Sequence, residues 1–450
     1  MEPVKYTRRE ILAAASAGAL LSLTAATPFK AFAIVNRENS RLAVRGGSPV
    51  RTAAWPDWPV WDEAADRDML EMLRSGKWWR GDGGHVEEFE KQYAEMIGAE
   101  YCLATASGTM ALITSLHVLG VDAGDEVIVS PYTFIASYNV IFDRKALPVF
   151  ADTDPETFLI NPAGIEEKIT DRTRAILPVH IYGLPVDMDS VNSIARKHNL
   201  FVIEDACQAW LAEYKGKKCG TLGDLGCFSF QNSKHIPTGE GGAITGENEG
   251  IMDRCHAHHN CGRPYGSVKA TSGYPIVGSN RRMAQYQAVM LLSQMKRARK
   301  DADIRLANAK YLDSKLKDIP GIIPYKLAPG ATRSAYHMYP FRYKKEYFNN
   351  APRAKFMAAL QAEGIPCSEG YGPQYRDGLI DEAISCRGFK RLFPESRLKD
   401  YKEQMHLPGN EQLCGEAVCI YQSLLLAGKN DMDDIVNAVT KIYNNKDQLN

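Results

Sequence analysis

The sequence has no excess of charge of either sign. Its 450 residues include 54 Lys and Arg against 54 Asp and Glu, so the formal net charge at pH 7 is zero. Nucleic-acid-binding proteins usually present a strongly basic surface, and this chain has no whole-chain basic field of that kind. We therefore expect a small-molecule ligand and no nucleic acid.

Cysteine is sparse as well. Ten cysteines are scattered along the chain, which is too few for the dense disulfide framework of a small secreted protein. Cys207 and Cys227 stand in apolar, strand-like runs, where reduced and buried cysteine is common. The chain also lacks an internal repeat and a low-complexity segment. Its 45% hydrophobic residues fit an ordinary globular protein with one large and one smaller domain.

The N-terminal residues have the pattern of an export signal. The pair Arg8-Arg9 precedes an Ala-rich apolar stretch at 13–26, and the Ala-Phe-Ala sequence at 31–33 suits a signal peptidase. This order predicts a twin-arginine signal peptide at 1–33. The stretch is short for a membrane-spanning helix, so we expect no stable membrane span after signal cleavage. The protein is then periplasmic or otherwise exported; the alternative is a cytoplasmic protein with a chance arginine pair.

Short apolar runs alternate with helical patterns from about residue 65. The runs lie at 126–129, 148–150, 175–179, 201–203 and 227–230. Their spacing fits βαβ units, and continuous apolar strands are typical of a parallel sheet covered by helices on both faces. The predicted fold class is therefore α/β, with a mostly parallel sheet. We predict a large domain at 41–295 and a smaller α+β domain at 296–450.

Ligands of such sheets bind at the carboxyl ends of the strands, so polar residues after the apolar runs are the first candidates. Ser107-Gly108-Thr109 precedes an apolar helix, whose free N–H groups would suit a phosphate, although helix capping is the commoner role. Asp205 closely follows the run at 201–203, where a carboxylate without a cationic partner would be costly. Capping of a following helix is the alternative for Asp205.

Lys234 is the candidate nucleophile. It follows the apolar run at 227–230 and precedes the glycine-rich residues 239–242, which places it on a loop beside closely approaching backbone. In a partly apolar cleft the pKa of its amine would fall, and the neutral amine would be nucleophilic. A lysine considered alone is most often a surface charge.

Five short motifs follow one another along the chain. They are residues 107–109 (SGT), 131–134 (PYTF), 203–209 (IEDACQA), 228–234 (FSFQNSK) and 239–242 (GEGG). In this order they resemble the DegT/StrS family of fold-type-I, pyridoxal-phosphate-dependent sugar and cyclitol aminotransferases. The match runs from about residue 45 to the end. Residues 259–264 resemble the subgroup of inosose aminotransferases and aminohydroxybenzoate synthases.

The resemblance implies a role for each matching residue. Lys234 would bind pyridoxal phosphate as a Schiff base, Asp205 would pair with the pyridine nitrogen, and Gln208 would approach the ring hydroxyl. Phe134 would stack on the ring, with core packing as the alternative. The phosphate site would comprise Gly108, Thr109, Ser229 and, from a neighbouring subunit, Asn280. A homodimer is therefore implied.

The implied reaction moves an amino group from glutamine or glutamate to a keto-sugar or keto-cyclitol, with Lys234 transferring the proton in both halves. Family dehydratases have histidine in place of this lysine. Here His235 is only its neighbour, which favours transamination. A dehydratase or non-catalytic regulatory member of the family and an exported carbohydrate-binding protein remain alternatives. A nicotinamide-dependent oxidoreductase would require a Gly-x-Gly-x-x-Gly turn after an early strand, and we find none.

Four further stretches bear on the metal and on the substrate. Residues 255–261, Cys-His-Ala-His-His-Asn-Cys, place thiols and imidazoles close together and suggest zinc, but the resemblance gives a simpler interpretation and we predict no metal. The tryptophans within 55–58 and 78–79 could flank a ring-shaped substrate, although packing is their default role. The segment 370–375 lacks a histidine that many sugar aminotransferases have, which argues against a nucleotide-sugar substrate.

Overall fold

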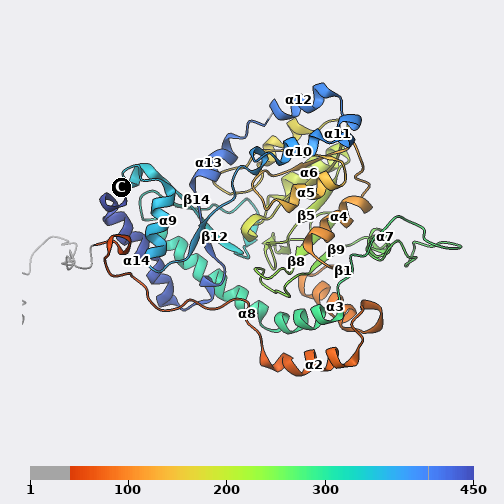
Figure 1. Ribbon diagram of the computed structural model, residues 1–450, viewed down its shortest axis with the longest axis horizontal. Coiled ribbons are helices and arrows are strands. Elements are labelled where there is room, and N and C mark those ends of the chain that lie inside the picture. Colours follow the sequence, from red (N-terminus) through yellow and green to blue (C-terminus); the bar gives the residue numbers. More distant parts are fainter. Residues whose placement is uncertain (1–40, 404) are drawn as a thin grey trace, which may run out of the picture. The chain divides into compact units, whose positions relative to one another are not determined.

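The structure is a computed structural model that describes residues 41–450 except residue 404 (Figure 1). The predicted signal peptide at 1–33 lies outside the described residues. None of the helices in the described part combines the length and the apolar character that crossing a membrane requires.

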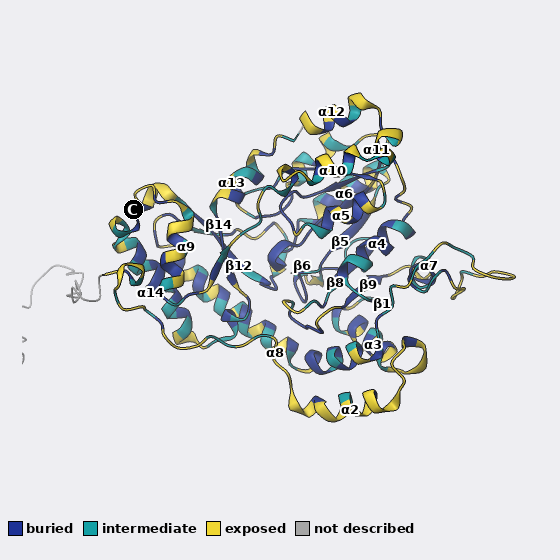
Figure 2. Cartoon of the chain, in the orientation of Figure 1, coloured by how far each residue is buried: buried dark blue, intermediate teal, exposed yellow. Residues whose placement is uncertain are grey.

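A seven-stranded sheet forms the centre of the fold. Its strand order is β1 (Tyr101–Thr105), β9 (Gly242–Gly246), β8 (Leu225–Ser229), β5 (Phe201–Asp205), β4 (Thr173–Leu177), β2 (Glu126–Val129) and β3 (Leu147–Phe150). Strand β9 is antiparallel to both of its neighbours, and the other pairs are parallel. The predicted mostly parallel sheet is confirmed, and its strands are largely buried (Figure 2).

Helices cover this sheet as the alternating pattern predicts. They are α3 (His85–Ile97), α4 (Gly108–Val118), α5 (Ala136–Asp143), α6 (Met188–His198) and α7 (Glu249–His259). Helix α4 packs against β8 and β9, α5 against β2 and β3, and α6 against β4 and β5. Helix α4 has buried side chains on almost every side, which explains why its sequence is apolar without a polar stripe.

A four-stranded antiparallel sheet follows the long helix α8 (Gln285–Leu316). Its order is β10 (Ile322–Pro324), β12 (Met338–Tyr343), β14 (Ala417–Tyr421) and β13 (Cys367–Glu369). Helix α9 (Arg353–Ala362) packs on β13, and α14 (Lys429–Asn444) packs on α8 and α9. Strands and helices are thus mixed after residue 295. Helix α8, however, continues across the predicted domain boundary between residues 295 and 296. The division into two domains therefore stays a prediction.

The remaining strands and α-helices of the described chain are smaller. They are the three-stranded sheet β11 (Ala331–Arg333), β6 (Glu213–Tyr214) and β7 (Lys217–Lys218), and the helices α2 (Asp66–Ser75), α10 (Leu379–Ser385), α11 (Arg387–Leu392), α12 (Glu395–Glu403) and α13 (Pro408–Glu416). Helix α2 buries only Met72 and is otherwise largely exposed (Figure 2).

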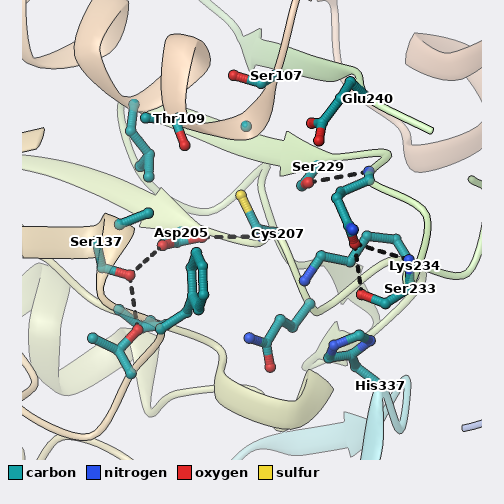
Figure 3. Close-up of a pocket in the computed structure, with 18 of the residues that line it drawn as sticks. Ser107, Thr109, Ser137, Asp205, Cys207, Ser229, Ser233, Lys234, Glu240 and His337 are labelled. Atoms are coloured by element: carbon teal, nitrogen blue, oxygen red, sulfur yellow. Dashed lines mark hydrogen bonds between the residues drawn. The ribbon is translucent and has the colours of Figure 1, made fainter. Parts of the chain in front are cut away.

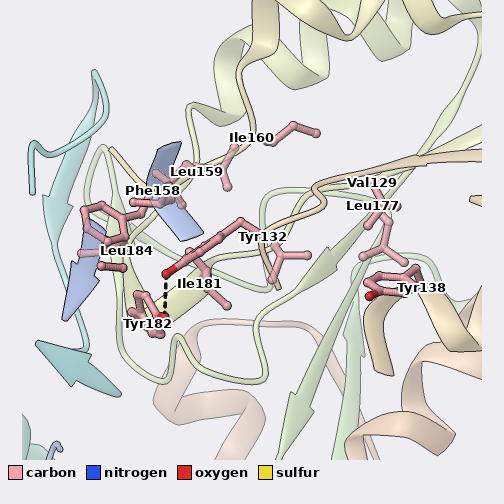
Figure 4. Close-up of a cluster of buried hydrophobic side chains, with 14 of the residues drawn as sticks. Val129, Tyr132, Tyr138, Phe158, Leu159, Ile160, Leu177, Ile181, Tyr182 and Leu184 are labelled. Carbon is pink, nitrogen blue, oxygen red and sulfur yellow. Dashed lines mark hydrogen bonds between the residues drawn. The ribbon is translucent and has the colours of Figure 1, made fainter. Parts of the chain in front are cut away.

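The main core contains a group of buried aromatic rings beyond the carboxyl ends of the strands (Figure 4). Tyr132 contacts Phe158 and Tyr182 edge-on, at centroid distances of 6.1 and 6.0 Å, and its hydroxyl lies 3.0 Å from that of Tyr182. Tyr182 has a left-handed backbone, with φ of 58°, which is uncommon for a non-glycine residue. This conformation turns its amide N–H toward Gln208, to which it donates at 2.9 Å.

Candidate active site

One cavity of about 530 Å³ lies at the carboxyl ends of β5 and β8 (Figure 3), where ligands of such sheets bind. Seven of the eight predicted site residues line it: Gly108, Thr109, Phe134, Asp205, Gln208, Ser229 and Lys234. They come from loops and strand ends that are up to 126 residues apart in sequence, from Gly108 to Lys234. The fold therefore brings the motifs at 107–109, 131–134, 203–209 and 228–234 together.

The N-terminus of α4 forms one wall of the cavity. Ser107 caps the helix by accepting the amide N–H of Met110 at 3.2 Å, so the capping role is confirmed for this residue. The amides of Gly108 and Thr109 remain without acceptors within the described part of the chain, and they lie at the positive end of the helix dipole. A side chain at Gly108 would lie 2.8 Å from both Cys207 Sγ and Ser229 Cβ. Only glycine fits here, and the wall suits an anion.

Asp205 ends β5 and is 5% exposed. Its Oδ2 accepts from Ser137 Oγ at 2.7 Å, and its Oδ1 accepts from the amide of Cys207 at 3.1 Å (Figure 3). No helix begins after Asp205, so the alternative role of helix capping is wrong. Asp205 forms no salt bridge with any described residue, which leaves a buried carboxylate that still needs a cation.

Lys234 lies on the loop between β8 and β9 and is partly buried. Burial lowers the pKa of its amine below the ordinary lysine value, while the nearby Cys207 and Asp205 raise it. Its Nζ makes no hydrogen bond and no salt bridge to the described residues. A lysine that lines a cavity and has no ionic partner is not a solvated surface charge, and its amine is available for chemistry.

Gln208 is held in one orientation by two hydrogen bonds. Its Oε1 accepts from the amide of Tyr182, and its Nε2 donates to Tyr371 Oη, both at 2.9 Å. The amide oxygen is therefore fixed away from Tyr371, and one N–H of Nε2 remains free for a ligand. The rings of Tyr182 and Tyr371 stack at 5.6 Å, which supports this arrangement.

Phe134 lies just before α5 and is 55% exposed. A side chain with this much exposure is not a core residue, so the packing alternative is wrong. Its ring faces the cavity, where a flat apolar ligand could cover it.

Asn280 is the one predicted residue that the single chain does not bring to the cavity. It is exposed, and its backbone forms an isolated bridge to Asn260. The tryptophans at 55, 58, 78 and 79 do not line the cavity either. Within one described chain, therefore, they do not flank a substrate there.

His337, Tyr371 and Glu240 also line the cavity, and none of them was predicted from the sequence as a site residue. His337 precedes β12 and is 8% exposed, and burial lowers its pKa well below the ordinary value, with the charge of Lys234 acting in the same direction. Its imidazole is therefore neutral, and its Nδ1 has no partner within residues 41–450. Only the tertiary fold places these residues, because no local pattern marks them.

The histidines and cysteines at 255–261 do not assemble a metal site in the described chain. His258 stacks on His117 at 4.0 Å, and His256 stacks on Tyr265 at 3.4 Å. The one described group of three potential ligands is His180, Glu204 and Cys219.

That group is a hydrogen-bonded network. The amide of Val186 donates to His180 Nδ1 at 3.0 Å, so the ring proton lies on Nε2, which is 2.9 Å from Glu204 Oε2. Three further amides donate to the Glu204 carboxylate, those of Gly220, Leu222 and Gly223. These contacts occupy the ring nitrogens of His180 and both carboxylate oxygens of Glu204, the atoms with which these two residues would bind a metal.

Comparisons with known proteins identify the family. Residues 60–423 match the DegT/DnrJ/EryC1/StrS aminotransferase family. The L-glutamine:2-deoxy-scyllo-inosose aminotransferase of Streptoalloteichus tenebrarius is 34% identical over 421 residues, covering 91% of this chain and 99% of the relative. The L-glutamine:2-deoxy-scyllo-inosose aminotransferase of Streptomyces fradiae is 34% identical over 416 residues, which cover 90% of this chain and 97% of the relative.

Solved structures show the same fold. A crystal structure of 3-amino-5-hydroxybenzoic acid synthase has a TM-score of 0.76 at 29% identity, covering 87% of this chain and 100% of that one. The NtdA protein of Bacillus subtilis, crystallised with bound cofactor PMP, has a TM-score of 0.71 at 26% identity, covering 88% and 86%. The resemblance and the α/β fold predicted from the sequence are confirmed: the chain belongs to the DegT/DnrJ/EryC1/StrS aminotransferase family and is an aminotransferase of fold type I.

Proposed function

We propose that the protein uses pyridoxal phosphate to transfer an amino group from glutamine to a keto-cyclitol or keto-sugar. The observation that carries the proposal is that one cavity holds a lysine amine without an ionic partner, a buried carboxylate without a cation, and a helix N-terminus whose first two amides have no acceptor among the described residues. The named relatives act on 2-deoxy-scyllo-inosose with L-glutamine, which supports this donor and this class of acceptor.

The donor set fits the three functional groups of pyridoxal phosphate. The phosphate suits the free amides at Gly108 and Thr109, where a Cβ at residue 108 would fill the space. The protonated pyridine nitrogen suits Asp205, which has two hydrogen bonds but no cationic partner. The carbonyl carbon suits the amine of Lys234, whose pKa is lowered by burial.

Each residue then has a defined task. When bound, pyridoxal phosphate supplies an electron sink and a carbon that accepts and returns the amino group. Asp205, which accepts a hydrogen bond from the hydroxyl of Ser137, would hold a proton on the pyridine nitrogen. The free N–H of Gln208 would donate to the ring hydroxyl. Lys234 Nζ would take a proton from the substrate carbon and pass it to the cofactor carbon that carries the amino group; burial lowers the pKa of this amine.

A homodimer is part of the proposal. Asn280 lies in a stretch with several exposed apolar side chains, namely Tyr265, Tyr274, Val277 and Tyr286, of 42 to 79% exposure. Exposed apolar side chains gathered in one stretch are typical of a protein interface. A second chain that covers this stretch could present Asn280 to the phosphate.

Export by the twin-arginine route is likewise a proposal. It is supported by Arg8-Arg9 and the apolar stretch at 13–26, both outside the described residues. The predicted cleavage after residue 33 also falls outside the described residues. Fractionation of cells that express the full chain tests the proposal. Wild type is expected in the exported fraction and Arg8→Lys/Arg9→Lys in the cytoplasm, and equal distributions would argue against export.

The test of the function uses purified protein with pyridoxal phosphate. Borohydride reduction followed by peptide mass mapping is expected to show the cofactor fixed on Lys234, and glutamine is expected to bleach the visible absorbance. Lys234→Ala should lose both signals, whereas Lys217→Ala, at an exposed lysine outside the cavity, should keep both. Wild type that binds no pyridoxal phosphate would remove the proposal. Bound cofactor that glutamine does not bleach would exclude glutamine as the donor.

A further inference from the structure

The loop that carries Lys234 is closed at its base, and within it Lys234 N donates to Gln231 O at 2.8 Å. Phe230 N donates to Gly241 O at 2.8 Å, Thr238 N donates to Phe230 O at 2.8 Å, and Asn232 N donates to Gly239 O at 3.0 Å. The tip at Lys234 and His235 is held from outside by two hydrogen bonds among the described residues. Trp58 Nε1 donates to Lys234 O at 3.2 Å, and His235 Nε2 lies 3.0 Å from Ala335 O.

Trp58 belongs to an N-terminal arm, residues 41–61, that runs from α14 along α8 (Figure 1). Arg51 fixes the arm on α14 through Asp431 and Asp434, at 2.5 and 2.9 Å. The carboxylate of Glu363, which is fully buried, accepts the amide of Val50 at 3.0 Å. Gln294 of α8 donates to Val60 O at 2.8 Å. The arm is thus anchored on both sides of Trp58.

The indole ring of Trp58 is fixed in orientation by two cations of α8. The guanidinium carbons of Arg297 and Arg305 each lie 5.2 Å from its centroid. Arg305 is fully buried, its three side-chain nitrogens have no hydrogen-bond partner in the described chain, and burial lowers its pKa to about 9. A buried guanidinium without an acceptor is stabilised by an aromatic face. The contact with Arg305 therefore keeps the ring in place and its N–H directed at Lys234.

We propose that Trp58 is a positioning residue for Lys234. Trp58 does not line the cavity, so it acts only through the main chain of the Lys234 loop. Loss of its N–H leaves Lys234 O without this donor and removes one of the two hydrogen bonds that hold the tip from outside the loop. The amine then spends less time opposite Asp205. This inference rests on the proposed role of Lys234 as the residue that binds the cofactor.

A pair of matched substitutions in the full chain tests the inference. Trp58→Phe keeps an aromatic face for Arg305 and removes the N–H. Trp55→Phe is the control, because Trp55 Nε1 donates to Gly364 O at 2.8 Å in the same arm but away from Lys234. The measurements are the Kd of pyridoxal phosphate, the midpoint of the pH titration of the visible absorbance, and kcat and KM for glutamine.

We expect Trp58→Phe to raise the Kd about three- to tenfold and to lower kcat by a similar factor, as loss of one hydrogen bond predicts. The titration midpoint should move, and KM for glutamine should stay close to wild type. Trp55→Phe should leave all four quantities close to wild type. Trp58→His, which keeps a ring N–H, should lie between wild type and Trp58→Phe.

The outcomes separate this inference from the proposed function. If Trp58→Phe and Trp55→Phe give the same Kd and titration midpoint, the inference is overturned while the function stands. The same holds if Trp58→His is as impaired as Trp58→Phe. If reduction fixes no cofactor on Lys234 in wild type, it is the proposed function that fails. If Trp58→Phe does not fold, Trp58→His is compared with Trp55→Phe instead. The inference then expects a higher Kd for Trp58→His than for Trp55→Phe, and equal values overturn it.

Discussion

Gly108 shows how a single residue defines the site. A Cβ at this position would meet Cys207 Sγ and Ser229 Cβ at 2.8 Å. We expect Gly108→Ala to raise the Kd of pyridoxal phosphate at least about tenfold, because the wall must move to relieve the overlap. Gly164→Ala is the control, since a Cβ there meets nothing within 4 Å. Fluorescence titration measures both affinities, and equal values would contradict the role of the close approach.

At the residue scale, Lys234 and Asp205 could be predicted because each follows an apolar, strand-like run within a motif. The phosphate site at 107–109 could be predicted because this motif precedes an apolar helix. It could not predict His337 or Tyr371, which reach the cavity from segments more than 100 residues after Lys234. Their positions depend on how the second sheet packs, and no local pattern records that packing. Asn280 could be named, but one chain does not place it in the cavity.

Helix α12 is tied to the central sheet by one buried ion pair. Glu126 of β2 is fully buried and accepts from Arg397 Nε at 3.0 Å and Nη2 at 2.6 Å. We expect Arg397→Met to lower the free energy of unfolding by about 3 kcal/mol, because it leaves a buried carboxylate without its cation. Arg333→Met, which breaks a pair with the exposed Asp303, should cost less than about 1 kcal/mol. Denaturant titrations measure both, and equal losses would refute this reasoning.

At the element scale, the apolar parallel strands were predictable because both of their faces are buried. Strand β9, Gly242–Gly246, was not, since a glycine-rich segment normally indicates a turn. The structure gives the reason for its glycine: a Cβ at residue 242 would lie 2.3 Å from the carbonyl carbon of Ser107. Glycine has a low preference for strands, but only glycine allows β9 to pack this closely against the N-terminus of α4.

For the whole molecule, buried histidines predict a loss of stability in acid. Burial lowers the pKa of His256 to about 3 and that of His258 to about 4, from an ordinary value of 6.5. Below pH 6.5 the unfolded chain therefore binds more protons than the folded one, and the free energy of unfolding falls as the pH drops toward 4. Urea midpoints across this window measure the slope. The double substitution His256→Gln/His258→Gln should make the free energy of unfolding less dependent on pH. An unchanged slope would show that these two histidines are not its cause.

Mixed dimers test the proposed exchange of Asn280 between chains. Lys234→Ala and Asn280→Ala chains are each expected to have little activity alone. When they are unfolded together and refolded, the heterodimer contains one site with both Lys234 and Asn280, provided that Asn280 acts across the interface. Activity should then return to a substantial fraction of wild type. If Asn280 serves its own chain, or if the protein is a monomer by light scattering, mixing restores nothing.

The two ends of the described chain are bonded to each other. Arg45 donates to Gln448 O and Asn450 O at 2.8 and 2.7 Å, and Arg51 pairs with Asp431. Since these partners are synthesised long after the arm, the contacts of Arg45 and Arg51 can form only once α14 and the residues after it have been made. The contacts of Trp58 with α8 and with the Lys234 loop involve residues that are made earlier. Full docking of the arm is therefore a late event in folding, and it must follow the formation of α14.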